Sequence, residues 1–210
     1  MIPAAAYAST AAYFGLSYGL SLWSLFHSRW LVVAAPKPFT SEIAYGLLVR
    51  CTASHGCRAF PQEDLGDCGH DVGQSLHGTV LSSVDNDNPG YGPGFCGAWR
   101  AARFAAIAAA VIGVLVLVEL AGTLLAKSYA RRARSWKVVA TLLSTHAICL
   151  VFATLIISDL ASKSALFYFD TSYGTGYWLT YASWIMEGCG VLALMAFALY
   201  ARRFPVYEVV

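Results

Sequence analysis

Charged side chains are scarce in this chain of 210 residues: aspartate, glutamate, lysine and arginine together make up 12%, whereas hydrophobic residues make up 58%. Soluble domains carry about twice that share of charge, which excludes an ordinary soluble domain. Internal repeats and charged tails are also absent, so we expect one domain over residues 1–210. This composition is typical of a protein that spans a lipid bilayer.

Signatures of catalysis are missing too. The chain has no Cys-x-x-Cys redox pair, no glycine-rich phosphate loop, no His-Glu-x-x-His zinc site and no nucleophile elbow at a strand-to-helix turn. A group of loop histidines and aspartates fits no standard zinc spacing. The group consists of His55, His70, His77, Asp67 and Asp71. We therefore expect no enzyme activity, no metal, no cofactor and no nucleic-acid partner.

Long apolar runs are what the sequence does contain. A hydrocarbon core of about 30 Å needs about 20 helical residues to cross it. Four runs reach that length, at Ala4–Phe26, Phe104–Ala126, Val138–Ser158 and Trp178–Ala201. No basic residue precedes the first run, which is also longer than the apolar part of a secretory signal, so we expect a retained helix. The expected fold class is an all-α membrane protein with a four-transmembrane-helix bundle.

Lysine and arginine residues set the expected orientation of these helices. The connection between the second and third runs has basic residues and no acidic one. This basic inner turn consists of Lys127, Arg131, Arg132, Arg134 and Lys137. Because basic short loops stay in the cytoplasm, we expect both termini there and the long loop, about residues 28–99, outside. The plasma membrane is favoured, and an organelle membrane remains open.

The long outer loop carries four of the six cysteines. They are Cys51, Cys57, Cys68 and Cys96. Oxidising conditions outside the cytoplasm permit disulfides, and of the possible connectivities, all of which stay open, we favour Cys51–Cys57 with Cys68–Cys96. Trp30–Ala35 and Ile43–Thr52 are rich in β-branched, aromatic and aliphatic residues, which predicts short strands. The loop is therefore expected to form a small disulfide-stapled cap that contains β-structure.

Two features of the sequence are candidates for contacts. A glycine- and proline-rich segment late in the loop either forms a flexible hairpin tip or presents Tyr91 and Phe95 as a partner-contact loop. Small residues spaced four apart let helices approach closely in lipid, and Gly15, Gly19 and Gly113 lie in such patterns. Packing within the bundle is the favoured interpretation of these glycines, and association with another membrane protein is the alternative.

Three ionisable side chains fall inside the expected membrane helices, where they are costly and are functional candidates by default. Glu119 and His146 reach a similar depth on neighbouring antiparallel helices, so we predict a hydrogen bond between them. The favoured role is to fix helix register, and a proton or ion pathway or contact with a partner are the alternatives. Glu187 lies nearer the outer face, where it either bonds to the first helix or faces a partner. The first-helix candidates are Ser17, Tyr18 and Ser21.

The order of the loops and a short pattern resemble a known family. The pattern consists of Trp30, Gly46-Leu47-Leu48, Cys51, Cys57 and, at the entry to the second helix, Arg100 or Arg103. It resembles the claudin and peripheral-myelin-protein group, with Leu48 in place of that group's second tryptophan. The resemblance implies a left-handed four-helix bundle capped by a small antiparallel sheet. It also implies roles in cell adhesion, in paracellular barriers or as an auxiliary subunit of a channel.

The expected function is that of a non-enzymatic membrane protein, an accessory or structural subunit of a larger complex that acts through helix packing and its disulfide-bonded loop. One alternative is a claudin-like adhesion or barrier protein that self-associates into a homo-oligomer. A second alternative is an ion- or proton-conducting component that uses Glu119, His146 and Glu187. The expected partners are the lipid bilayer and other membrane-protein subunits.

Overall fold

A computed structural model describes residues 4–34, 42–54, 56–62, 67–68, 93–126, 129–163, 167 and 171–203. The contacts between Cα atoms divide the chain into two compact units. The helical unit comprises Met1–Leu22, Ala106–Val151 and Leu179–Val210, and the cap unit comprises Trp23–Ala105 and Phe152–Trp178. The single domain expected over residues 1–210 stays a prediction.

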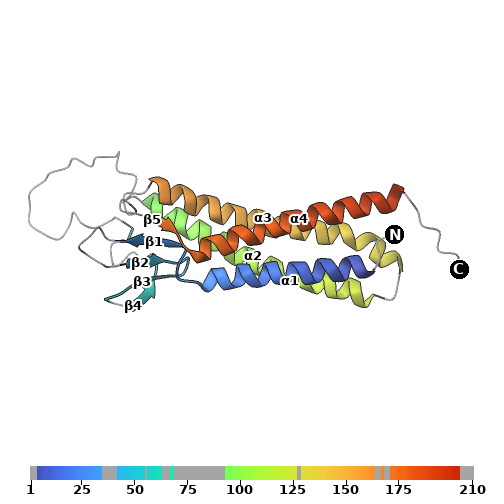
Figure 1. Cartoon of the computed structure of the whole chain (residues 1–210), viewed down its shortest axis with the longest axis horizontal. Coiled ribbons are helices and arrows are strands. Elements are labelled where there is room, and N and C mark those ends of the chain that lie inside the picture. Colours follow the sequence, from blue (N-terminus) through green and yellow to red (C-terminus); the bar gives the residue numbers. More distant parts are fainter. Residues whose placement is uncertain are drawn as a thin grey trace, which may run out of the picture. The chain divides into compact units, whose positions relative to one another are not determined.

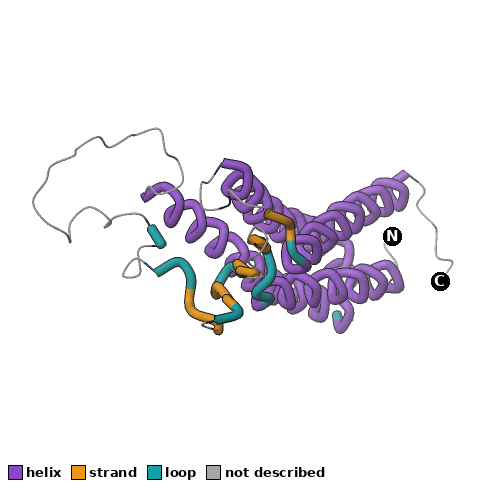
Figure 2. Tube along the Cα trace, turned by 60° about the vertical axis from the view of Figure 1, so that its left-hand side comes forward, coloured by secondary structure: helices purple, strands orange, loops and turns teal. Residues whose placement is uncertain are grey.

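Four helices account for most of the described residues (Figure 1, Figure 2). They are α1 (Ala4–Phe26), α2 (Pro93–Leu125), α3 (Tyr129–Lys163) and α4 (Thr175–Arg203). The bounds of α1 agree with the predicted run, whereas α2, α3 and α4 all begin before theirs. An apolar run marks only the hydrophobic part of a helix. Ahead of the runs in α2 and α3, alanine and arginine continue the helix because they favour that conformation, whereas α4 begins with Thr175-Gly176-Tyr177.

Three of these helices are long and apolar enough to cross a membrane, within the part of the chain that the structure describes. The spanning segments are Gly94–Leu125, Ser135–Lys163 and Thr175–Tyr200, with mean hydropathies of 2.6, 2.1 and 1.7. The prediction of four such spans therefore holds for three helices, and α1 is not among them. Its hydropathy is lower because serine, threonine, tyrosine and glycine interrupt its apolar residues.

The basic inner turn is largely helical, which corrects its prediction as a loop. Four of its five residues lie in the first turns of α3, namely Arg131, Arg132, Arg134 and Lys137. Lys137 is exposed, and Lys127 lies outside the described residues. The neighbouring alanine and arginine residues favour a helix even though they are not part of an apolar run, so hydropathy placed the helix start too late.

Five short strands form one antiparallel sheet in the cap unit (Figure 1). They are β1 (Leu31–Ala34), β2 (Glu42–Tyr45), β3 (Val49–Thr52), β4 (Gly56–Ala59) and β5 (Thr171–Tyr173). Their order in the sheet is β4-β3-β2-β1-β5. β5 lies between α3 and α4 in the chain and pairs with β1, so the sheet joins two segments that are far apart in sequence.

The predicted strand Ile43–Thr52 is in fact a hairpin of two strands. β2 ends at Tyr45, β3 begins at Val49, and the Gly46 N–H donates to the Val49 carbonyl at 2.8 Å. A Cβ at Gly46 would lie 2.8 Å from the His27 carbonyl oxygen, so this close approach requires glycine. The sequence predicts one strand because a single glycine among β-favouring residues is too weak a pattern to predict a turn.

The core of the helical unit draws on segments of all four helices. Its buried side chains are Tyr7, Phe14, Tyr18, Val116, Leu120, Val139, Ala140, Leu143 and Leu194. Gly113 packs as predicted, because a Cβ there would overlap the Tyr18 ring. Gly15 and Gly19 do not, since a Cβ at either would meet nothing within 4 Å. α1 turns Phe14 and Tyr18 toward the core. Gly15 and Gly19 directly follow these two residues, so they point in a different direction around the helix.

Gly174→Ala is expected to lower the free energy of unfolding by about 1–3 kcal/mol, the usual cost of overpacking. Gly174 follows β5, its N–H donates to the Trp30 carbonyl at 2.9 Å, and an added Cβ would overlap the Arg29 carbonyl. Gly97→Ala is the matched control, because Gly97 lies in α2 of the same unit with open space around it. Thermal unfolding in detergent micelles measures both variants, and equal midpoints would contradict the close approach at Gly174.

Candidate functional site

Two disulfides staple the cap unit. Cys51 and Cys57 lie directly opposite each other on β3 and β4 and are bonded to each other. Cys68 is bonded to Cys96, which lies in the first turn of α2. This is the connectivity that the sequence analysis favours. The two other cysteines are free and lie in α3 and α4.

Aromatic rings fill the interior of the cap unit. They belong to Tyr45, Phe60, Phe95, Trp99 and Phe167. Ring centroids lie 5.0 Å apart for Phe60 and Trp99 and 5.2 Å apart for Tyr45 and Phe60, mostly in the edge-to-face geometry that aromatic pairs prefer. The Trp99 Nε1–H donates to the carbonyl of Leu47, in the β2–β3 turn, at 3.3 Å. These contacts give the small sheet a hydrophobic core against the first turns of α2.

The structure contradicts the predicted partner-contact role of Phe95. Phe95 is 2% exposed and its ring centroid lies 5.7 Å from that of Trp99, so it belongs to the cap interior. The proline and glycine residues of its segment predict a turn. Pro93 instead begins α2, a position where proline costs nothing because the first N–H groups of a helix have no partner in the helix. Tyr91 lies outside the described residues.

The residues of the family-like pattern divide into buried and exposed ones. Trp30 is 1% exposed, and its Nε1–H donates to the Ser24 carbonyl near the end of α1 at 2.8 Å. Leu47 is fully buried. At the entry to the apolar part of α2, Arg100 is exposed and Arg103 is half-buried. The tryptophan and the leucine therefore anchor the cap, and the arginines lie at or near its surface.

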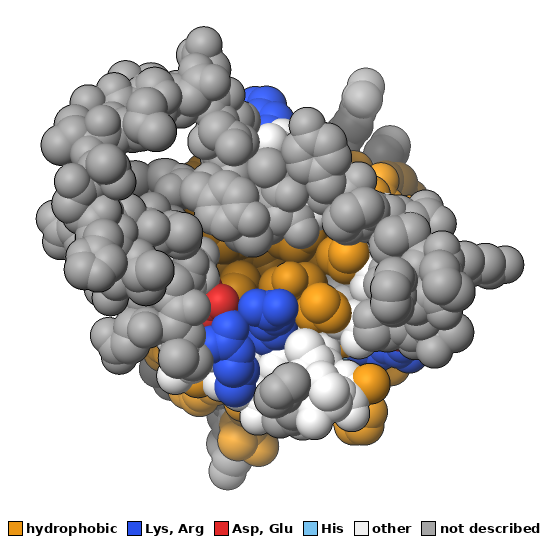
Figure 3. All heavy atoms as spheres, turned by 90° about the vertical axis from the view of Figure 1, so that its left-hand side faces the viewer, with side chains coloured by type: hydrophobic (Ala, Val, Ile, Leu, Met, Phe, Trp, Pro, Cys, Tyr) orange, Lys and Arg blue, Asp and Glu red, His pale blue; other side chains and the backbone are white. Residues whose placement is uncertain are grey.

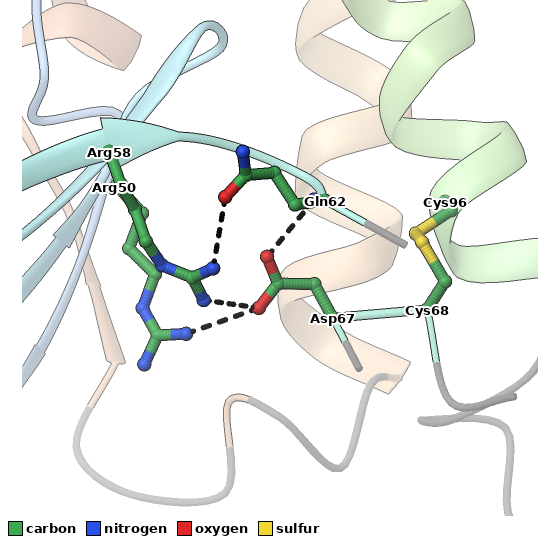
Figure 4. Close-up of a disulfide and its surroundings, with 6 residues drawn as sticks. All are labelled: Arg50, Arg58, Gln62, Asp67, Cys68 and Cys96. Atoms are coloured by element: carbon green, nitrogen blue, oxygen red, sulfur yellow. Dashed lines mark hydrogen bonds and ion pairs between the residues drawn. A yellow bond between two sulfur atoms is a disulfide. The ribbon is translucent and has the colours of Figure 1, made fainter. Parts of the chain in front are cut away.

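A charged cluster lies beside Cys68 and joins β3 to β4 (Figure 4). Arg58 Nη2 and Arg50 Nη1 both donate to Asp67 Oδ1, at 2.6 and 3.4 Å. The Gln62 N–H donates to the other carboxylate oxygen, Oδ2, at 3.0 Å. The Asp67 side chain is 5% exposed, whereas those of Arg50 and Arg58 are 23% and 32% exposed. A nearly buried carboxylate thus holds two guanidinium groups that reach the surface in part.

A second polar cluster is buried in the helical unit and joins three helices. Ser17 Oγ in α1 donates to Glu187 Oε1 in α4 at 2.7 Å. His146 Nδ1 in α3 lies 2.6 Å from Glu187 Oε2, and Ser183 Oγ donates to the Ser17 carbonyl at 3.0 Å. Glu187 is 2% exposed and the other three residues are fully buried. The four side chains form one hydrogen-bonded network in an apolar surrounding.

The predicted hydrogen bond between Glu119 and His146 is not formed, because His146 bonds to Glu187. The prediction rests on the depth of each side chain in the membrane, measured from the ends of the apolar runs. The actual helix bounds put His146 and Glu187 near the middle of α3 and α4, whereas Glu119 is half-buried and lies close to the end of α2. Of the predicted first-helix partners of Glu187, Ser17 is the one that bonds to it.

One ring nitrogen of His146 bonds within this network and the other does not. His146 Nδ1 lies 2.6 Å from Glu187 Oε2. His146 Nε2 is buried and has no hydrogen-bond partner in the part of the chain that the structure describes. The rings of Phe14 and Tyr18, with centroids 5.5 and 5.8 Å from the imidazole, supply weak aromatic contacts instead.

Ser17 lies in the segment Gly15-Leu16-Ser17-Tyr18-Gly19, which has the Gly-x-Ser-x-Gly spacing of many hydrolases. In hydrolases this spacing forms a strained turn between a strand and a helix, and histidine stands between the serine and the acid. Here the segment is helical, and Glu187 stands between Ser17 and His146. This order suits a structural network rather than an activated serine nucleophile.

Of the histidines and aspartates considered for a metal, Asp67 is the one that the structure describes. Its carboxylate is taken up by Arg50, Arg58 and Gln62. Within the described ranges, no group of three or more histidine, cysteine, aspartate or glutamate side chains has a metal-binding arrangement.

The two polar clusters and the disulfides therefore provide the structural basis for assigning a function. Comparison with known proteins adds no assignment, since no protein-family model and no curated protein matches the chain.

Proposed function

We propose that this chain is a non-enzymatic four-helix membrane protein that acts as an accessory or structural subunit of a larger membrane complex. The cap unit carries the proposal, because two disulfides and an aromatic core stabilise a small sheet whose charge cluster reaches the surface. Disulfides form in oxidising compartments, which favours a cap outside the cytoplasm and both termini inside.

α1 is proposed as the fourth membrane span despite its lower hydropathy. Its buried face carries hydroxyl groups, including those of the fully buried Ser17 and Ser24. Its outward face carries large apolar side chains, since Leu16, Trp23 and Phe26 are 61%, 68% and 71% exposed. The mean hydropathy of α1 includes its buried hydroxyl groups, although lipid would not contact them. The side chains that lipid would contact are apolar, as expected of a membrane helix.

The resemblance to the claudin and peripheral-myelin-protein group supports the same proposal. Helices with one small antiparallel sheet agree with the fold that the resemblance implies. Trp30 and Leu47 are buried, and Gly46 lies at a close backbone approach, as expected of pattern residues that determine how a cap folds. In that family, accessory subunits and adhesion proteins share this architecture. For this chain we favour the plasma membrane as the location.

The subunit role predicts a heteromeric complex. The tagged chain, purified from its own membranes in mild detergent, should retain another membrane protein in a fixed molar ratio, measured by native mass spectrometry. Cys68→Ser should weaken this retention because it releases the cap from α2. Cys189→Ser is the matched control, since Cys189 is an exposed free cysteine in α4 and its loss should leave the partner bound.

Two outcomes of the mass measurement contradict the subunit role. Homomers without another protein would support the adhesion or barrier alternative instead. A single chain under every mild detergent condition would exclude stable assembly of either kind.

A second candidate function, conduction of protons or ions, is favoured by one observation. His146 and Glu187 are titratable, lie 2.6 Å apart and have side chains that are 0% and 1% exposed. Paired ionisable groups inside a membrane protein mark proton relays in many pumps and transporters. The structural role is preferred here because burial separates both groups from solvent.

A further inference from the structure

A hollow of about 350 Å³ lies between α1 and α4 in the helical unit. α1 contributes Ser9, Thr10 and Tyr13 to its lining, and α4 contributes Cys189, Gly190 and Ala193. All of these residues except the tyrosine are small, so they leave space that larger side chains would fill. Pockets that bind small ligands have volumes of about 300–1,000 Å³. The hollow is therefore large enough to hold a ligand.

The hollow exists because α1 and α4 diverge on one side of the point where they are bonded to each other. Ser183 Oγ in α4 donates to the Ser17 carbonyl in α1 at 3.0 Å, and Ser17 Oγ donates to Glu187 at 2.7 Å. From this point the two helices diverge toward the first residues of α1 and the last residues of α4 (Figure 1). The buried bonds hold the helices at this crossing, so the hollow is formed before any ligand binds.

The lining of the hollow favours a hydrocarbon ligand. None of the lining residues is charged, whereas charged side chains lie on the face of the molecule shown in Figure 3. Ser9 and Thr10 already have partners within the chain, so their hydroxyl groups do not require a polar ligand. An empty hollow would forfeit dispersion contacts, and water is retained only where several polar groups can bond to it. A flexible apolar chain restores those contacts.

The depth of the hollow corresponds to that of lipid acyl chains. Ser9 lies five residues into α1, and Ala193 lies ten residues before the end of α4. At 1.5 Å per residue they are about 8 Å and about 15 Å from those helix ends. The head-group region of a bilayer is only about 5–8 Å thick on each side. A phospholipid with its head group at the surface therefore has its acyl chains at the level of the hollow.

The size of the hollow and its surroundings favour one acyl chain over a partner helix. One turn of a helix occupies roughly 400–600 Å³, which is more than the hollow offers. Leu16 lies one turn from Tyr13 and Leu192 one turn from Cys189, on the same helix faces, and both leucines are exposed. These large side chains would keep the backbone of a partner helix away from the small residues, whereas an acyl chain can pass between them.

We propose that the hollow binds one acyl chain of a membrane phospholipid, from the leaflet on the side of the first residues of α1. No cationic residue lines the hollow to hold the carboxylate of a free fatty acid, whereas a phospholipid keeps its charged groups at the surface. This inference rests on the proposed placement of α1 as a membrane span.

Dioleoylphosphatidylcholine is the probe, added to the purified full-length chain in a steroid-based detergent that has no alkyl chain of its own. Native mass spectrometry should show one tightly bound phospholipid per chain. Ala193→Phe should weaken the binding about 5-fold to 150-fold, the range for overpacking a filled site. Cys189→Phe fills the hollow from the neighbouring turn and should act in the same way. Ala196→Phe is the matched control and should leave the affinity unchanged, because Ala196 is exposed on α4 but does not line the hollow.

A phosphatidylcholine with a photoreactive diazirine in one acyl chain tests the location. Cross-links should fall on the peptides that contain Tyr13 or Cys189 and should disappear in Ala193→Phe. Equal phospholipid affinity in Ala193→Phe and the native chain would overturn the proposal, as would oleate that binds more tightly than the phospholipid. Binding that appears only after residues 204–210 are removed would assign the hollow to the chain itself. An unchanged unfolding midpoint verifies that each variant is folded.

The outcome is distinguishable from that of the subunit role, because phospholipid binding is measured on the isolated chain. Its absence would refute the acyl-chain site and leave the subunit role standing. A partner protein that cross-links at Cys189 in the intact complex, with no phospholipid bound, would assign the hollow to a partner helix instead. Phospholipid binding by a chain that forms no heteromeric complex would refute the subunit role alone.

Discussion

Glu187→Leu is expected to lower the free energy of unfolding by about 3–5 kcal/mol, as removal of one member of a buried pair does. A single interhelical hydrogen bond in a membrane protein contributes only about 0.6 kcal/mol on average. The larger loss arises because leucine would leave His146 and the Ser17 hydroxyl without their bonds to Glu187. Denaturation of the detergent-solubilised chain measures the effect. Glu119→Leu is the control, because Glu119 is half-buried near the end of α2, and its effect should be much smaller.

The double variant His146→Leu/Glu187→Leu should recover most of that loss. Removing both partners leaves neither unsatisfied, whereas removing one exposes the full desolvation cost of the other. In either variant the single Ser17 hydroxyl proton, no longer donated to Glu187, turns to the Ser183 carbonyl, which lies 3.1 Å from Ser17 Oγ. A double variant that is less stable than Glu187→Leu would contradict this network as the source of the effect.

Glu187→Gln separates the structural role from proton conduction. Glutamine keeps an acceptor for Ser17 and a donor toward His146 Nδ1, so the stability cost should stay near about 1 kcal/mol. An amide cannot exchange a proton with histidine in the physiological range. If vesicles with the native chain conduct protons and vesicles with Glu187→Gln do not, the network is a proton pathway rather than a brace between helices.

Features that depend on one segment were predictable from the sequence, whereas features that depend on how segments meet were less so. The bounds of α1 follow from its apolar run. The disulfide pairing agrees with the favoured connectivity, although the sequence leaves the other connectivities open. The partner of His146 depends on where α3 and α4 begin, and neither helix begins where its apolar run begins. The depth assigned to Glu187 was therefore wrong, even though its contact with α1 was among the predicted options.

The cap shows the same limit for β-structure. β5 has only three residues, Thr171–Tyr173, and its pairing with β1 depends on a strand far away in the sequence. The Arg50–Arg58–Asp67 cluster also depends on pairing, because alternation within β3 cannot reveal which residue of β4 lies opposite Arg50. A register based on the Cys51–Cys57 bond would have placed Arg50 opposite Arg58, since the bonded cysteines are direct neighbours of the two arginines.

Removing the Cys68–Cys96 disulfide with a double serine variant is expected to cost about 3.5 kcal/mol, compared with about 2 kcal/mol for Cys51–Cys57. The two bonds close loops with sequence separations of 28 and 6 residues. A longer closed loop removes more conformational entropy from the unfolded chain, so its loss destabilises the folded state more. Non-reducing denaturation in detergent compares the two variants, and excess thiol should bring them to the same midpoint.

The opposite ranking would assign the stability of the cap to a different cause. Cys51 and Cys57 face each other across the β3–β4 hairpin, whose arginines repel and whose strands have only four residues each. A larger loss from the short loop would mean that the bond holds the hairpin together against this repulsion in the folded state. Adding Asp67→Asn distinguishes loop entropy from repulsion in the hairpin. It removes the carboxylate that neutralises the arginines, so it should enlarge the effect of losing Cys51–Cys57 only if that bond acts against the repulsion.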